Sequence, residues 1–462
     1  MIEKYVFKHK DNPVIAFEFD SETLRAVNII DIADETRLPF ILPPENKYNT
    51  CLLELNDWIN YRGMPESRDN YINILFETGA SSGKELSINS LGLNLSDHYW
   101  LHKEKLNLKW EKLNFFDNNF KEVVLKNAFN DNTSNIHPDF SVDGRLIKKW
   151  VCYNNERFLI KEGSAKDLQE PFNELIASNI LDFYNIDHVK YDIKKIDKRI
   201  VSVCKCMVDK NSELIPAKYV FDKDGKIQDN PYNHFIKVCS ENGIKDARKN
   251  IDEMIILDCI IGNEDRHRRN FGILRNPDTL EWLGFAPVFD NGNSLCFREG
   301  SNMENLEKRT DSYCKWFERS NMQKLEYIDI SNWYNNKFDR NIIDIVAEGL
   351  KNNINDEKRN KILVIVKNRI EFAENYISER KNTVATGFTL EDLSKKTGYI
   401  QGVCESVLAL GDDYIQSKKL FSKMKITKED AKKYAHPETY KKLEEGIFSQ
   451  KQEQNINKSR KR

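Results

Sequence analysis

A polar segment bounded by apolar residues constrains this chain more than any other feature. Residues 261–272 read Ile-Gly-Asn-Glu-Asp-Arg-His-Arg-Arg-Asn-Phe-Gly, and residues 286–292 read Ala-Pro-Val-Phe-Asp-Asn-Gly. A phosphoryl-transfer site needs a carboxylate that takes a proton from the attacking hydroxyl, and it needs an amide oxygen and a second carboxylate that bind Mg²⁺. Asp265, Asn270 and Asp290 supply these groups in that order along the chain. The pattern therefore indicates phosphoryl transfer.

The spacing of these residues supports the same interpretation. The five-residue step from Asp265 to Asn270 equals the Asp-to-Asn step of kinase catalytic loops, and Asp290 precedes Gly292 in an Asp-x-Gly pattern. His267 lies where a cation would meet the transferring phosphate. The alternative is a polar loop between two helices, because Asp and Asn are common turn residues. That alternative leaves the apolar residues on both sides of the segment unexplained.

These motifs resemble those of HipA-like serine/threonine protein kinases, a bacterial branch of the protein-kinase-like fold related to the phosphatidylinositol kinases. HipA-like chains carry Asn-x-Asp-x-His-x-x-Asn, present here over residues 263–270, and Ala-Pro-x-x-Asp, present over residues 286–290. The resemblance covers about residues 135–380. It implies a kinase that uses ATP and Mg²⁺.

The resemblance also implies a role for each matching residue. Asp265 would act as the base, with His267 and Asn270 as its catalytic neighbours. Asn270 and Asp290 would bind Mg²⁺.

A strand lysine and a helix glutamate complete the expected ATP site. Lys161 ends the apolar strand predicted over residues 157–161, and Glu174 lies on the helix predicted over residues 170–184. Kinases pair such residues to hold the nucleotide phosphates, and the resemblance implies this role for Lys161. Glu170, one turn earlier, is the alternative to Glu174, and a solvated helix charge is a further alternative.

The phosphate loop of the family, Ser-x-x-Gly followed by Lys, corresponds to Ser141, Gly144 and either Lys148 or Lys149. Backbone N–H groups of such a loop bind phosphate, whereas the alternative interpretation is a plain surface turn. The resemblance further implies that Ser141 is an autophosphorylation site, because a phosphate in this loop would repel the nucleotide. An unmodified turn serine is the alternative. We expect the phosphate to attract arginines of the catalytic loop, namely Arg266, Arg268 or Arg269.

The predicted fold class is α+β, a bilobal protein-kinase-like fold with a mainly helical C-lobe and additions at both ends. The predicted parts are an N-terminal accessory region over residues 1–120, an N-lobe over 121–209, a helical C-lobe over 210–384 and a basic helical appendage over 385–462. The accessory region is rich in aromatic residues and reads as irregular, so we ascribe its Arg62 and Arg68 to packing and surface charge.

Apolar patterning predicts further elements inside the two lobes. A hairpin is expected around Asn154 and Asn155, and a short strand over residues 201–207 is suited to place backbone groups against adenine. Helical periodicity is clear at residues 251–261, 342–350 and 362–376.

Composition and charge limit the classes of protein. The chain has 71 Lys+Arg and 73 Asp+Glu, a formal charge of -2, so its overall balance does not call for nucleic acid or an anionic membrane as partner. Its nine cysteines include no Cys-x-x-Cys pair, which argues against a disulfide framework. An N-terminal stretch without an apolar core and the lack of a long apolar run predict a soluble, cytoplasmic protein.

The C-terminal appendage carries its own charge pattern. Residues 417–462 hold 14 Lys+Arg against 6 Asp+Glu, and residues 390–408 resemble a helix-turn-helix. DNA contact is one interpretation, and an ordinary helix pair with a solvated basic tail is the more common outcome. The family resemblance implies a toxin-antitoxin kinase with an antitoxin partner and a protein substrate such as a translation component. The alternatives are a lipid or small-molecule kinase and an inactive kinase-like binding module associated with DNA.

Overall fold

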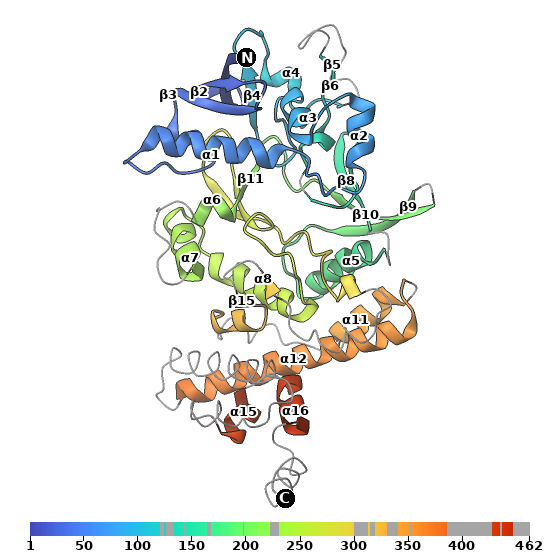
Figure 1. Cartoon of the computed structure of the whole chain (residues 1–462). Coiled ribbons are helices and arrows are strands. Elements are labelled where there is room, and N and C mark those ends of the chain that lie inside the picture. The colour runs from blue at the N-terminus through green and yellow to red at the C-terminus, as the bar shows by residue number, and fades with distance from the viewer. Residues whose placement is uncertain are drawn as a thin grey trace, which may run out of the picture.

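The structure is a computed structural model in which the elements are stacked from an N-terminal sheet at one end to two short C-terminal helices at the other (Figure 1). It describes residues 1–120, 124–125, 134–142, 144–163, 168–196, 198–221, 231–299, 313–314, 319–329, 341–351, 353–385, 427–434 and 437–446. The predicted helix-turn-helix at residues 390–408 lies outside these ranges.

The chain contains both helices and antiparallel sheets, in runs of each kind, which agrees with the mixed helix and sheet content of the α+β prediction. The strands are β1 (Ile2–His9), β2 (Asn12–Asp20), β3 (Arg25–Ile32), β4 (Tyr99–Lys103), β5 (Val124–Leu125), β6 (Ser134–Asn135), β7 (Lys148–Tyr153), β8 (Glu156–Glu162), β9 (Tyr191–Ile196), β10 (Arg199–Lys205), β11 (Glu213–Pro216), β12 (Gly272–Arg275), β13 (Trp282–Phe285), β14 (Tyr313–Cys314) and β15 (Arg319–Ser320). The helices are α1 (Lys47–Arg62), α2 (Tyr71–Thr78), α3 (Gly83–Asn89), α4 (Trp110–Leu113), α5 (Gln169–Phe183), α6 (Ala217–Phe221), α7 (Pro231–Glu241), α8 (Ala247–Ile261), α11 (Asn341–Leu350), α12 (Asp356–Ala385), α15 (Lys428–Tyr434) and α16 (Pro437–Gly446), with short 3-10 turns that include η2 (Pro138–Ser141).

The N-terminal region contains a regular antiparallel sheet, so its interpretation as irregular is wrong. The strand order is β3-β2-β1-β4, and α1 packs against β3. Buried side chains alternate with more exposed ones, as Tyr5 and Phe7 do on β1 and Phe17 and Phe19 do on β2. This period of two is typical of a sheet with one face in the core.

The second sheet confirms the predicted hairpin and helix. Its order is β7-β8-β10-β9, all neighbours are antiparallel, and α5 packs against β8, β9 and β10. The hairpin turns at Asn154 and Asn155, whose φ angles of 49° and 61° are left-handed. Two such residues make the turn type that matches the twist of paired strands.

A third sheet and the buried helix α8 place the polar segment of the chain. The order is β11-β12-β13. Gly272 allows β12 to approach β11, because a Cβ there would lie 2.2 Å from the carbonyl oxygen of Ile215. Helix α8 ends at Gly262, which has a left-handed φ of 63° and so acts as a C-cap. The predicted helices α8, α11 and α12 are present, and among the described residues no helix is long and apolar enough to cross a membrane.

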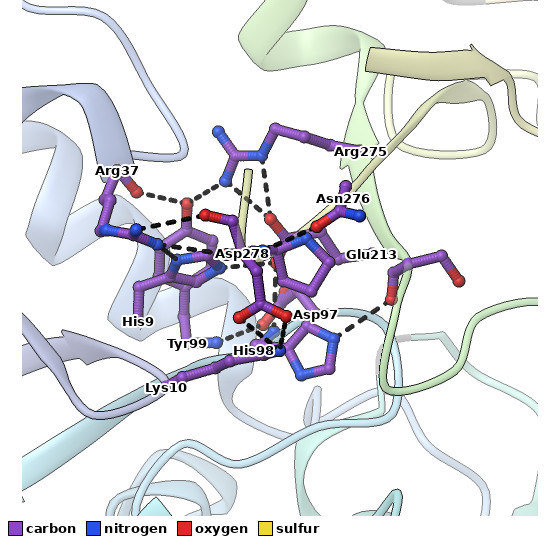
Figure 2. Close-up of polar contacts among 12 residues, drawn as sticks. His9, Lys10, Arg37, Asp97, His98, Tyr99, Glu213, Arg275, Asn276 and Asp278 are labelled. Atoms are coloured by element: carbon purple, nitrogen blue, oxygen red, sulfur yellow. Dashed lines mark hydrogen bonds and ion pairs between the residues drawn. The ribbon is translucent and has the colours of Figure 1, made fainter. Parts of the chain in front are cut away.

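A buried polar network joins the N-terminal sheet to β11 and β12 (Figure 2). The Glu213 carboxylate is fully buried and lies 2.9 Å from Nε2 of His9 and 2.9 Å from Nε of Arg275, which donates to it. Tyr99 on β4 contacts the Arg275 guanidinium through its hydroxyl. Burial alone would raise the pKa of Glu213, but His9, Arg275 and His98 outweigh it and lower this pKa to about 2.

We expect Glu213→Gln to lower the free energy of unfolding by about 3–5 kcal/mol at neutral pH, because the variant leaves Arg275 without its buried counter-charge. A carboxyl with a depressed folded pKa contributes stability above its unfolded pKa, and this contribution is lost as pH falls toward the folded pKa. The difference between wild type and variant should therefore shrink as the pH falls from 4.5 to about 2. Urea denaturation followed by tryptophan fluorescence at several pH values measures it.

The matched control is Arg199→Gln, which breaks the exposed ion pair between Arg199 and Glu162. Exposed pairs contribute about 0–1 kcal/mol. Equal losses in the two variants would contradict a structural role for the Glu213 network.

Candidate active site

Two cavities meet at a shared group of charged and amide side chains. The shared side chains belong to Lys148, Lys161, Asn270 and Asp290. The first cavity, about 270 Å³, is lined on one side by apolar residues of the second sheet and its surroundings, namely Leu159, Val189, Cys204, Met207 and Phe289. The second, about 350 Å³, is more polar and includes Gly144, Glu170, Glu174, Asp265, His267 and Asn293.

Lys161 lies at the centre of this arrangement. Its side chain is buried on β8, and its Nζ donates to Oε1 of Glu174 at 2.8 Å and to Oδ1 of Asp290 at 2.7 Å. The second oxygen of Glu174 accepts the backbone N–H of Asn291 at 2.8 Å. The structure thus pairs Lys161 with Glu174 rather than with Glu170, which lies on the same helix.

The charges of this cluster shift one another's ionisation. Burial alone would lower the pKa of Lys161, but the carboxylates of Asp290 and Glu174 outweigh burial and raise it well above its usual value. Burial raises the pKa of Glu174. Asp290 is partly exposed, and the cations of Lys161 and Lys148 hold the pKa of its carboxyl well below its ordinary range. Both shifts favour a protonated Lys161 beside an ionised Asp290.

The backbone at Asp290 is itself unusual. Its φ of 58° lies in the left-handed region, which residues other than glycine seldom adopt and which clusters at functional sites. Its N–H donates to the hydroxyl of Tyr191 at 3.3 Å, and Tyr191 also lies 3.5 Å from Nζ of Lys161. Sequence reasoning did not identify Tyr191, since a lone strand tyrosine carries no motif.

Asp265 is held in place by two asparagines. Its backbone N–H donates to Oδ1 of Asn263 at 2.9 Å, and its Oδ2 accepts from Nδ2 of Asn293 at 2.8 Å. Asn263 also donates to Asp258 at the end of α8. The predicted catalytic loop is therefore fastened to the helix before it and to the Asp290 segment after it, with the Asp265 carboxylate on the wall of the second cavity.

Arg266 joins the catalytic loop to the Asp290 segment. Its side chain is fully buried and donates to Asp258, to the carbonyl oxygens of Asn270 and Phe289, and to the side chain of Asn291. A guanidinium carries five donors in a fixed fork, which suits it to this cross-link. Arg268 and Arg269 instead lie over the rings of Phe221 and Tyr61, respectively.

Asn270 and Asp290 fit the oxygen ligands that Mg²⁺ prefers. Nδ2 of Asn270 donates to the carbonyl oxygen of Asp265 at 2.9 Å, which orients the amide and directs its Oδ1 away from that bond. Asp290 supplies a carboxylate of lowered pKa on the same border between the cavities. An amide oxygen and a carboxylate, completed by phosphate and water oxygens, are suited to Mg²⁺. Among the described residues no group of three or more His, Cys, Asp or Glu forms a metal cluster.

The predicted phosphate loop lies beside both cavities. Ser141 and Val142 line the first cavity, and Gly144 lines the second. Gly144 has a φ of 99°, and a Cβ there would lie 2.5 Å from Nζ of Lys148. Lys148 faces the cavities, whereas Lys149 is exposed, so the structure favours Lys148 of the two predicted lysines.

His267 also lines the second cavity, as do Asp265 and Asn270 of the same predicted loop. Its Nδ1 accepts the backbone N–H of Arg269 at 3.2 Å. The imidazole therefore turns Nε2 away from that contact, and the ring contributes to lowering the pKa of Asp290.

Comparison with known proteins finds a curated protein whose sequence is similar to this chain. No family model matches the chain. The chain is 26% identical over 216 residues to the serine/threonine-protein kinase CtkA of Helicobacter pylori. The matched region covers 40% of this chain and 64% of that protein. This match confirms the predicted resemblance to serine/threonine-protein kinases. The chain spans less than two thirds of the length of that relative.

Two solved structures show a partial likeness. The crystal structure of the Helicobacter pylori proinflammatory kinase CtkA is 18% identical, covers 50% of this chain and 94% of that chain, and gives a TM-score of 0.38. The Shewanella oneidensis toxin-antitoxin complex of HipA, HipB and operator DNA is 13% identical, covers 85% of this chain and 99% of that chain, and gives a TM-score of 0.45.

We expect Lys161→Met to destabilise the protein by about 3–5 kcal/mol at neutral pH, because it leaves Glu174 and Asp290 together without their cation. The pKa of this carboxyl pair should then rise in the folded state. A raised carboxyl pKa costs stability above the unfolded value, and the cost fades as the pH falls. The deficit should thus be smaller at pH about 5 than at pH about 8, as denaturant titrations can measure. The double variant Lys161→Met/Glu174→Gln should recover part of the loss, and no recovery would contradict charge as the cause.

Proposed function

We propose that the chain is an ATP-dependent serine/threonine protein kinase of HipA type. The observation that carries the proposal is Lys161, held between Glu174 and Asp290 at the border of two cavities where Asn270 also lies. The sequence relationship to a serine/threonine-protein kinase supports it. In this proposal residues 121–209 form the N-lobe of a bilobal fold.

The first cavity suits the nucleoside part of ATP. Its apolar wall between β8, β10 and Phe289 can take a flat base, and the segment after β10 carries Cys206 and Met207 along the same wall. The triphosphate would then reach the border between the cavities, where Lys161 and Lys148 supply positive charge. Fixed cations in a partly buried site stabilise the charge that develops on a transferring phosphoryl group.

The second cavity suits the acceptor hydroxyl. Asp265 lies on its wall with its carboxylate oriented by Asn293, so it can accept the proton of an approaching serine or threonine. Asn270 and Asp290 would hold Mg²⁺, which neutralises phosphate charge when it is bound. His267 adds a donor close to the same position. Positioning and charge neutralisation are most of what phosphoryl transfer requires of a protein.

Labelled ATP tests this proposal, with the purified chain alone and with a cell lysate, and with Asp265→Asn beside the wild type. We expect label on protein with the wild type and a loss of about 10²–10⁴-fold in rate with Asp265→Asn, while Mg²⁺-ATP affinity stays within a few-fold. Label on lipid or on a small molecule would identify the alternative kinase classes. No label with any acceptor would indicate an inactive binding module.

Asp290→Asn should behave differently from Asp265→Asn. Since Asp290 would bind the metal, calorimetry should show a loss of Mg²⁺-ATP affinity of about ten-fold or more, equal to about 1.4 kcal/mol. Turnover should fall as well. Unchanged affinity in Asp290→Asn would remove this residue from the metal site.

Ser141 is the proposed autophosphorylation site. Its side chain is buried, and its Oγ lies 3.4 Å from Oγ of Ser87, so the loop must leave this position before the hydroxyl can be modified. Phosphate would prevent its return, because the dianion cannot be buried without counter-charge. Mass spectrometry after incubation with ATP should find phosphate on Ser141 in the wild type and not in Asp265→Asn. Absence from both would refute the hypothesis.

An antitoxin protein and DNA remain proposed partners through the family resemblance. The substrate proposed on the same ground is a protein, such as a translation component. Helices α15 (Lys428–Tyr434) and α16 (Pro437–Gly446) lie in the basic appendage, and apart from them and Thr427 the residues 386–462 lie outside the described ranges.

A further inference from the structure

The N-terminal region contacts the phosphate loop through one buried arginine. Arg68 lies immediately before α2, and only 3% of its surface is exposed. Its guanidinium donates to the carbonyl oxygens of Gly144 at 3.2 Å and of Val142, with a longer contact of 3.5 Å to that of Asp139. A single side chain of the N-terminal region thus contacts the loop at several points, from Asp139 to Gly144.

Neighbouring residues of the N-terminal region make contacts of the same kind. Nδ2 of Asn94 donates to the carbonyl oxygen of Ser141, and the backbone N–H of Asp69 donates to that of Arg145 at 3.1 Å. In each of these bonds the N-terminal residue is the donor and a loop carbonyl is the acceptor. The direction of the loop backbone is therefore set by donors outside the loop.

We propose that Arg68 is a positioning residue that holds the phosphate loop over the nucleotide, so that the N-terminal region is a working part of the ATP site. The inference rests on the proposed kinase function. Arg68 acts through the loop and touches neither ATP nor the acceptor.

The chemistry of the loop explains why such a donor is needed. A carbonyl oxygen that faced the cavities would repel the phosphate oxygens, whereas backbone N–H groups attract them. Arg68 binds the carbonyl oxygens of Val142 and Gly144 and itself lines neither cavity, so these bonds hold the two carbonyls toward a donor outside the cavities. A charged donor also makes stronger hydrogen bonds than a neutral one. Arg68 thus orders the loop before ATP binds, and the conformational entropy that the loop loses on binding is smaller.

The fork of the guanidinium is essential to this role. Lysine has the same charge but presents it as a single point, so it cannot reach the separated carbonyls together. We expect Arg68→Lys and Arg68→Met each to raise the KM for ATP about ten-fold or more, with a smaller change in kcat at saturating ATP. Hydrogen exchange of residues 139–146 should become faster in the nucleotide-free variants.

Arg37→Lys is the matched control. Arg37 also belongs to the N-terminal region and also donates to backbone carbonyls across the junction, those of Pro277 and Asp278 at 3.1 and 3.3 Å, but these lie at the β12–β13 turn (Figure 2). Its substitution should leave the KM for ATP within two-fold of the wild type. An equal rise of the KM for ATP in Arg68→Lys and Arg37→Lys would overturn the proposal. Such a result would mean that any weakening of the contact between the N-terminal region and the rest of the chain impairs ATP binding.

The experiment separates the two proposals. If wild-type protein fails to bind Mg²⁺-ATP, the kinase proposal fails, and the exchange of residues 139–146 still tests the positioning by Arg68. If wild-type protein binds ATP while KM and loop exchange are unchanged in Arg68→Lys and Arg68→Met, the positioning role is wrong. Thermal melting of each variant identifies any loss of folding, and faster exchange confined to the loop supports positioning.

Discussion

The site depends on one buried cation, Lys161, which two carboxylates share. A lysine with a nearly buried side chain is tolerated only when opposite charge is close, and here Glu174 comes from α5 while Asp290 comes from the segment after β13. The ion pairs therefore fasten a strand, a helix and a distant loop to one point. A metal ion bound to Asp290 would share the carboxylate of Asp290 with Lys161.

The N-terminal region contacts the rest of the chain at several places, and two of these contacts differ in their physical character. At the Glu213 network, the buried contact of His9 with Glu213 and the hydrogen bond between Tyr99 and Arg275 join β1 and β4 to β11 and β12, whose own Glu213 and Arg275 form a buried ion pair. At Arg68, donors from the region satisfy carbonyls of a loop that borders both cavities. The first attachment reaches the wall of the first cavity through Tyr99, whereas the second lies beside the residues proposed to bind phosphate. A region added to a kinase-like core can in this way shape the core's ligand site.

The sequence predicted the local features of the site well and its long-range supports poorly. Asp265 and Asn270 could be found because their spacing is fixed within one loop, and the hairpin at Asn154 could be found because its turn residues have a conformational signature. The contacts of Arg68 and Arg266 could not, since the sequence shows neither that a guanidinium will be buried nor which distant carbonyl oxygens it will meet. Their burial is decided by acceptors far away in the chain, such as Gly144 and Phe289.

The alternating burial of β1 and β2 marks where sequence reading failed on the fold. Tyr5, Phe7, Phe17 and Phe19 alternate with more exposed residues, but the interpretation of the region as irregular did not use this period of two. The mistake also concealed the role of the region. A regular sheet with a buried face is rigid, and a donor such as Arg68 can position a loop only if it is itself held by a rigid support. Arg68 itself lies outside this sheet, between α1 and α2, and α1 packs against β3, so the sheet would support the proposed positioning of the phosphate loop through α1.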